Sequence, residues 1–172
     1  MKEKGTLENP YKYGDIANVF GYNTFTSENQ PIYIKMVRKM EPKEIIEKIR
    51  EHNKKFDEGS IYRIEEKNDA YTRIGVIVQI DYKDFPTTEL GQTVHPIPIF
   101  KLTHDEYDFS IPIPYVVSEN IGFVNDSVFQ GNVNDYAVLF RFPKGRDDSS
   151  ILMEIPRVPG KMEDIQYFKI VW

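Results

Sequence analysis

The stretch YTRIGVIVQIDY, residues 71–82, decides the fold that we expect for this chain. Its alternate positions carry mostly apolar side chains: Thr72, Ile74, Val76, Val78, Ile80 and Tyr82. The opposite face carries Arg73, Gln79 and Asp81 beside Gly75 and Ile77, so it is half polar. Such alternation is typical of a β-strand with one face in a core and the other face partly in water. The sequence therefore predicts one long, half-buried strand here.

The same alternation recurs along the chain and predicts a β-rich domain. Clear patterns occupy residues 31–39, 136–142, 150–156 and 165–172. Weaker patterns occupy residues 15–20, 60–66, 97–102, 110–117 and 121–124. The 172 residues contain no obvious linker, so residues 1–172 are expected to form a single domain. The expected fold class is α+β but predominantly β, a barrel-like or sandwich-like antiparallel sheet with one main helix.

The one helix is expected in MEPKEIIEKIREHNKKFDEG, residues 40–59, with a span of about 42–57. Pro42 suits the first helical turn, and Gly59 suits a left-handed residue after the end. One face of the helix repeats at helical spacing: Ile45, Ile46, Ile49, Asn53 and Phe56. His52 lies beside this stripe and is interpreted as a packing residue at its boundary, not as a metal ligand.

Composition excludes several kinds of chemistry. The chain has no cysteine, so it has neither disulfides nor thiol catalysis. Its first residues are polar, and no apolar run reaches the roughly 18 residues of a membrane span, which favours a cytoplasmic protein without a membrane partner. The net charge of −5 argues against nucleic acid as a partner, because acidic proteins repel phosphate backbones. The glycine-rich phosphate loops and the nucleophile-elbow motif are absent.

Charge is distributed unevenly along the chain. Residues 95–140 carry six acidic side chains and one basic one, whereas residues 32–64 carry nine basic and six acidic side chains. The acidic segment would complement a basic surface on another protein.

The stretch HPIPIFKLTHDEYDFSIPIPYVV, residues 95–117, contains the candidate site. Its prolines at 96, 98, 112 and 114 block one hydrogen-bonding edge of each arm, which predicts a ribbon at a sheet edge. The acidic tip combines aromatic and charged side chains: Asp105, Glu106, Tyr107 and Asp108. Aromatic side chains supply contact energy and acids steer association, so we predict that these four residues bind the partner.

Three functions remain open at this stage. The favoured one is a non-enzymatic protein-binding module, most like an acidic inhibitor or immunity-type protein that covers a basic site on its partner. A hydrolase-type enzyme could instead use His104 or His95 with neighbouring carboxylates. A structural subunit of a viral or other assembly is the third. No cofactor or metal is expected, because the two histidines lack metal-site spacing.

The aromatic residues of 9–25 allow two interpretations. Tyr11, Tyr13, Phe20, Tyr22 and Phe25 could stack on a base or a sugar, or they could pack in the core. Core packing is the favoured interpretation.

Overall fold

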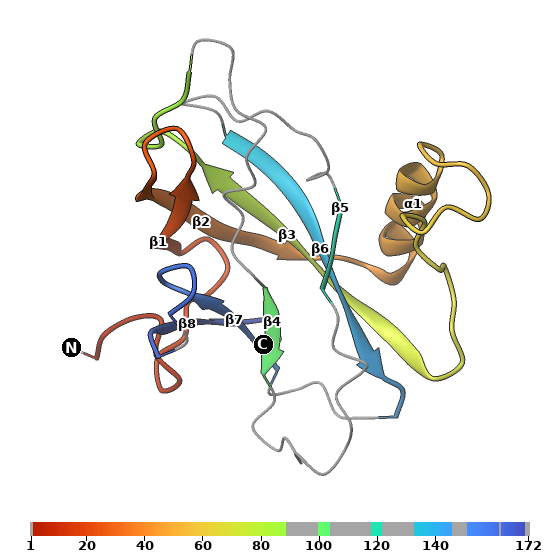
Figure 1. The fold of residues 1–172 in the computed structure, drawn as a ribbon. Helices are drawn as coiled ribbons and strands as arrows, with labels where there is room; N and C mark the ends of the chain where they lie inside the picture. Colours follow the sequence, from red (N-terminus) through yellow and green to blue (C-terminus); the bar gives the residue numbers. More distant parts are fainter. Residues whose placement is uncertain are drawn as a thin grey trace.

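The structure is a computed structural model that describes residues 2–88, 100–103, 118–121, 133–145, 151–161 and 163–170. Within these parts, eight strands and one helix form a β-dominated α+β fold (Figure 1). The strands belong to two antiparallel sheets, and no closed barrel forms among the described residues. The fold class expected from the sequence is thereby confirmed.

The larger sheet has five strands in the order β1-β2-β3-β6-β5. These strands are β1 (Ile16–Asn23), β2 (Glu28–Lys39), β3 (Tyr71–Asp81), β6 (Val133–Pro143) and β5 (Ser118–Ile121). Central β3 pairs with β2 on one side and with β6 on the other. The predicted alternation along β3 is confirmed, except that Thr72 is exposed near the start of the strand.

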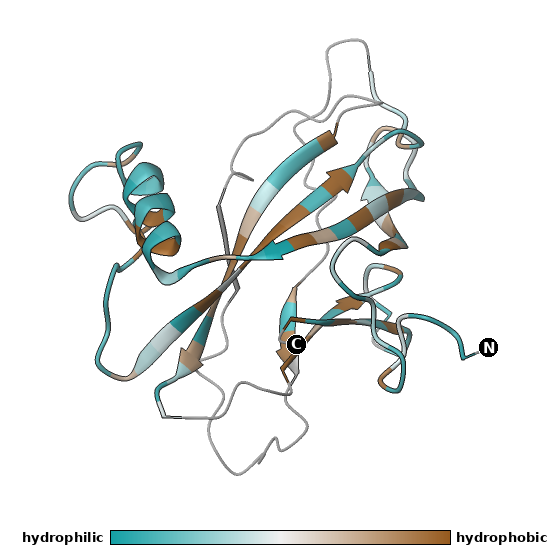
Figure 2. Ribbon diagram, turned by 180° about the vertical axis from the view of Figure 1, so that it is seen from behind, coloured by the Kyte–Doolittle hydropathy of each residue, from teal (hydrophilic) through white to brown (hydrophobic). Residues whose placement is uncertain are grey.

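The smaller sheet has three strands in the order β4-β7-β8: β4 (Lys101–Thr103), β7 (Leu152–Pro156) and β8 (Ile165–Lys169). The N-terminal segment extends this sheet through a parallel bridge between Tyr11 and Phe168. Apolar side chains of both sheets form one core, in which Val76 and Val78 join Met153 and Phe168. Figure 2 shows the alternation of hydrophobic and hydrophilic residues along the strands that produces this arrangement.

Helix α1 (Pro42–Asn53) lies on the other face of the five-stranded sheet, away from the smaller sheet (Figure 1). Its buried Ile45 and Ile49 form a second apolar cluster with Met40, Ala137 and Leu139. The helix approaches β3 closely at Gly75, where an added Cβ would lie 2.9 Å from Met40 Sδ and 3.0 Å from Ile45 Cγ1. Because Gly75 has no side chain, Met40 and Ile45 can pack directly against the sheet at this position.

The helix is shorter than the sequence predicts, since it ends at Asn53 instead of residue 57. Asn53 is buried, and its amide bonds the backbone of Ile64 twice, with both heavy-atom distances at 2.8 Å. These bonds draw the chain back across the helix end, so residues 54–56 turn away. Gly59 does adopt the left-handed conformation, at φ +84°, but in a later turn.

The predicted strand at 60–66 is wrong. These residues form an irregular loop, because their backbone groups bond the end of the helix instead of another strand. Ile61 is 89% exposed, and only Ile64 packs against the helix cluster. In the part of the chain that the structure describes, this short stretch has no neighbouring strand to pair with.

Of the other weak strand predictions, the one at 15–20 is confirmed by β1, and the remaining ones fall only partly within the described residues. Strands β4 and β5 overlap the predicted segments 97–102 and 121–124, whereas 110–117 and the four prolines of the ribbon lie outside the described residues. In the described part of the chain, no helix is long and apolar enough to span a membrane.

Candidate functional site

The partner-binding residues predicted from the sequence, Asp105, Glu106, Tyr107 and Asp108, lie outside the described residues. His95 and His104, the candidate catalytic residues, also lie outside them. His52 is described, and it packs as predicted: the ring is buried, lies 5.1 Å from the Phe56 ring, and bonds the Tyr62 carbonyl oxygen at 2.9 Å. Its position in the helix–loop junction supports a structural role.

A second candidate surface is the half of the five-stranded sheet that lies away from α1 (Figure 1). Strand register places its residues: Asn18 faces Tyr33, which faces Asp81 on β3, and Phe20 faces Pro31. We call this surface the open face. Its members are the outward-facing residues of β1 and β2 and the adjoining parts of β3 and β6: Ile16, Asn18, Phe20, Tyr22, Pro31, Tyr33, Lys35, Gln79, Asp81, Val133 and Asp135.

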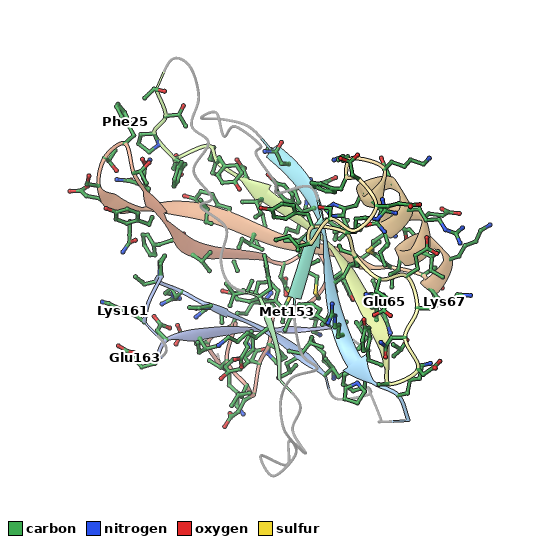
Figure 3. All side chains as sticks on the ribbon, turned by 45° about the vertical axis from the view of Figure 1, so that its right-hand side comes forward. Phe25, Glu65, Lys67, Met153, Lys161 and Glu163 are labelled. Atoms are coloured by element: carbon green, nitrogen blue, oxygen red, sulfur yellow. The ribbon has the colours of Figure 1, made fainter. Side chains whose placement is uncertain are left out.

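Large apolar side chains on the open face are in contact with water. Ile16 is 63% exposed and Tyr22 49% exposed at the two ends of β1, and Val133 is 51% exposed on β6. Phe25, 54% exposed, projects from the tip of the turn between β1 and β2 (Figure 3). Large exposed apolar side chains gathered on one face are typical of an interaction surface, whereas scattered ones are ordinary.

Polar contacts fix the centre of this surface. The Tyr33 hydroxyl donates a hydrogen bond to Asp84, and this bond raises the pKa of Tyr33. The Lys83 ammonium lies 4.4 Å from the centre of the Tyr33 ring. On the neighbouring strands, Gln79 Nε2 donates to Asp135 Oδ1 at 3.1 Å. The tyrosine ring is thus held between a cation and a carboxylate within the chain itself.

The aromatic cluster predicted in residues 9–25 divides between core and surface. Tyr11 packs in the core with its ring 5.0 Å from that of Phe168. Tyr13 packs against the same core, and its hydroxyl donates to the Ile170 carbonyl oxygen at 2.7 Å. Phe20 is half-buried, and Tyr22 and Phe25 are exposed. The core interpretation is therefore confirmed for the first two residues only.

The other half of the same sheet face is covered by α1. Gly75, Ile77, Ala137 and Leu139 lie there and meet the apolar side of the helix. At the border with the open face, a cavity of about 190 Å³ separates the helix from the sheet and is lined by His52, Asp135 and Lys48 among others. In the described parts of the chain, no three histidine or carboxylate side chains gather where they could hold a metal ion.

Comparison with protein-family models, with curated proteins and with solved structures gave no match for this chain.

Sequence reasoning could not predict which residues lie together on the open face. Tyr33 was visible in an alternating stretch but was not identified as a candidate for binding, and Phe20 was considered only as part of the aromatic cluster at 9–25. They become neighbours only through the pairing of β1 with β2. Their exposure in turn depends on the side of the sheet where α1 packs.

Proposed function

We propose that this chain is a non-enzymatic protein-binding module, of the inhibitor or immunity type, and that it binds its partner through the open face. The observation that carries the proposal is that exposed Ile16, Tyr22 and Val133 lie on the same face of the sheet as the preorganised Tyr33, with exposed Phe25 in the adjoining turn. Aromatic anchors surrounded by polar groups are the usual composition of an interface centre.

The charge of the open face favours a basic partner. Asp81 and Asp135 lie on it and Asp84 borders it, against Lys35 and Lys83, so acids are in excess. The whole chain is also acidic, with a net charge of −5. An acidic field speeds the approach of a basic protein and repels a phosphate backbone. This charge is why we favour protein over nucleic acid for the aromatic side chains on the sheet.

The acidic tip at Asp105, Glu106 and Asp108 remains part of the proposal on the strength of the sequence alone. Replacing these three acids with their amides is expected to slow association with the basic partner, and added salt is expected to mask the difference. Tyr107→Ala is expected instead to speed dissociation, by a factor corresponding to about 2 kcal/mol or more if Tyr107 is a central anchor.

The experiment compares two matched double variants as bait in the lysate of the source organism. Tyr22→Ala with Phe25→Ala removes two exposed aromatic side chains of the proposed interface. Ile61→Ala with Tyr62→Ala removes two exposed side chains, 89% and 62% exposed, from the loop after α1. A specific partner should be captured by the wild type and by the loop variant, and lost with the first variant.

The captured partner should carry a basic surface, and its binding should weaken as salt is added. Both double variants should unfold within about 0.5 kcal/mol of the wild type, because the substituted side chains are exposed. Equal capture by all three proteins would contradict the placement of the interface. Capture of nucleic acid or of an acidic partner would contradict the class of partner.

A further inference from the structure

The open face and the part of the sheet under α1 belong to one continuous surface. Along β3, Gly75 and Ile77 contact the helix cluster, and Gln79 and Asp81 are the next two residues on the same side of the strand. The paired residues of β6 divide between the helix and the open face in the same way. Helix α1 is therefore the direct neighbour of any molecule that binds the open face.

A cavity of about 190 Å³ lies at the border between these two halves of the surface. Its walls include Lys48 and His52 of α1, Lys55 after the helix, and Ile77 and Asp135 of the sheet. Helix α1 is thus not sealed against the sheet on the side that faces the open face. A second helix packed at this border would close the cavity.

The usual spacing of packed helices matches the position of the open face. Neighbouring helices pack with their axes about 8–10 Å apart, which corresponds to about three residues along a strand. The third residue beyond Ile77 along β3 is Ile80, which lies between Gln79 and Asp81 of the open face. A helix packed beside α1 and displaced along β3 would therefore lie over the open face.

The open face has room for one helix. The residue steps from Ile16 to Tyr22 correspond to about 20 Å along the strands, and the strand spacings from β1 to β6 correspond to about 14 Å across them. A helix with its side chains is about 10–12 Å across. The face therefore accommodates one helix, which at about 1.5 Å per residue needs about 14 residues to cover the long dimension.

A strand added to the edge of the sheet is the main alternative occupant. The edge that borders the open face is the outer edge of β1, where the Phe20 amide donates to the Arg157 carbonyl oxygen at 2.8 Å. Arg157 follows β7, so a segment of the smaller sheet already occupies the middle of this edge. Strand addition needs a continuous row of open backbone groups. We therefore favour an occupant that packs on the face of the sheet.

The charges of the open face define the kind of helix that fits it. Asp81 lies between Tyr33 and Val133 in the strand register, and Asp135 lies at the border with α1. A helix with lysine or arginine on both sides of an apolar stripe complements this pattern, because long basic side chains reach carboxylates while their stems cover apolar surface. Two open faces would place acids against acids, which argues against a second copy of this chain as the occupant.

We propose that the open face binds a basic amphipathic helix of the partner, packed on the sheet beside α1, an inference that rests on the proposed function. The apolar stripe of the helix covers Tyr33 and Val133, and its basic flanks meet Asp81 and Asp135. The partner's helix and α1 then form one layer over the five-stranded sheet (Figure 1).

The probe is a pair of synthetic peptides of identical leucine and lysine composition, each about 14 residues long. One peptide places its leucines at helical spacing, and the other alternates leucine with lysine, as a strand does. Each peptide is labelled with fluorescein and titrated with the whole chain, and binding is followed by fluorescence anisotropy. The helical peptide should bind with a dissociation constant on the order of 100 µM, as expected for a small interface, and the alternating peptide about 10-fold more weakly.

Two pairs of matched variants locate the site. Tyr33→Ala should weaken binding of the helical peptide about 10-fold or more, whereas Tyr62→Ala, in the loop after α1, should change nothing. Asp135→Asn should weaken binding about 2-fold to 5-fold, and added salt should remove the difference. Asp57→Asn makes the same change of charge at an exposed position of the loop and should have no effect.

Thermal unfolding by circular dichroism would show which variants remain folded. Val133→Ala removes an exposed side chain, so it keeps the test valid if Tyr33→Ala does not fold, and it should weaken binding about 2-fold to 5-fold. The helix inference is overturned if the helical peptide shows no saturable binding, or if the alternating peptide binds equally well or better. It is also overturned if the open-face variants and their matched loop variants bind the helical peptide equally.

The helix inference and the proposed function can fail separately. If the helical peptide does not bind while capture from the lysate still depends on Tyr22 and Phe25, the helix inference is wrong and the protein-binding function stands. Capture that survives Tyr22→Ala with Phe25→Ala contradicts the proposed interface and, with it, the helix that the interface was inferred to hold.

Discussion

The two halves of the outer face of the five-stranded sheet differ in what they present. Under α1, the outward positions are small or apolar, as at Gly75, Ala137 and Leu139. On the open face, the outward positions of the strands are occupied by Asn18, Tyr33 and Gln79, and by large apolar residues that are partly exposed to solvent. The half under α1 therefore packs against a helix of the same chain. The open face has the composition of a surface that binds another molecule.

The largest expected difference is in stability. Ile49→Ala removes a fully buried side chain between α1 and the sheet, so it should lower the free energy of unfolding by about 2–5 kcal/mol. Ile16→Ala removes an exposed side chain from the open face and should change it by less than about 0.5 kcal/mol. Urea denaturation of both variants measures the two values. A small loss for Ile49→Ala would mean that α1 contributes little to the fold.

Two asparagines give a smaller contrast. Asn53→Ala leaves the partly buried backbone groups of Ile64 without their partners, so a loss of about 1–3 kcal/mol is expected. Asn18→Ala, on the open face, should cost less than about 0.5 kcal/mol. Limited proteolysis should also cut the loop at 54–66 faster in Asn53→Ala. Equal proteolysis of the two variants would contradict the role given to the Asn53 amide.

The smallest contrast concerns two tyrosines at alkaline pH. Burial raises the pKa of Tyr13 to about 12, above the value of about 10 in an unfolded chain. The stability that Tyr13 contributes is therefore complete below pH 10 and is lost as the pH rises through about 12. Tyr13→Phe should reduce this alkaline loss and cost about 1 kcal/mol at neutral pH through the missing hydrogen bond to Ile170.

Tyr33→Phe is the matched change on the open face. The bond to Asp84 also raises the pKa of Tyr33, but this hydroxyl is exposed, so its contribution to stability is screened by water and salt. Thermal melts from pH 8 to pH 12 should separate the two variants. If Tyr33→Phe reduced the alkaline loss of stability more than Tyr13→Phe does, our assignment of Tyr13 to the interior and of Tyr33 to the surface would be wrong.

The sequence predicted the parts of the fold that depend on local pattern. Alternation located β2, β3 and β6, and the proline at residue 42 marked the start of α1 correctly. The end of α1 and the loop at 60–66 were wrong, because Asn53 and His52 bond the backbone of that loop at long range. No local pattern reveals that a helix side chain will satisfy a backbone group about ten residues later.

The open face was less accessible to sequence reasoning for the same reason. Tyr33 joins Phe20 only through the β1–β2 register. Strand order and register depend on the whole chain, whereas alternation depends on a few adjacent residues.

The most direct test of the open face is hydroxyl-radical footprinting of the purified chain with and without its captured partner, with oxidation followed residue by residue. Tyr22, Phe25 and Tyr33 should become protected in the complex, while Tyr62 and Ile61 beside α1 should react as they do in the free protein. Protection of Tyr62 and Ile61 with unchanged oxidation of Tyr22 and Phe25 would show that the partner binds beside the helix, and would contradict our assignment of the open face as the recognition surface.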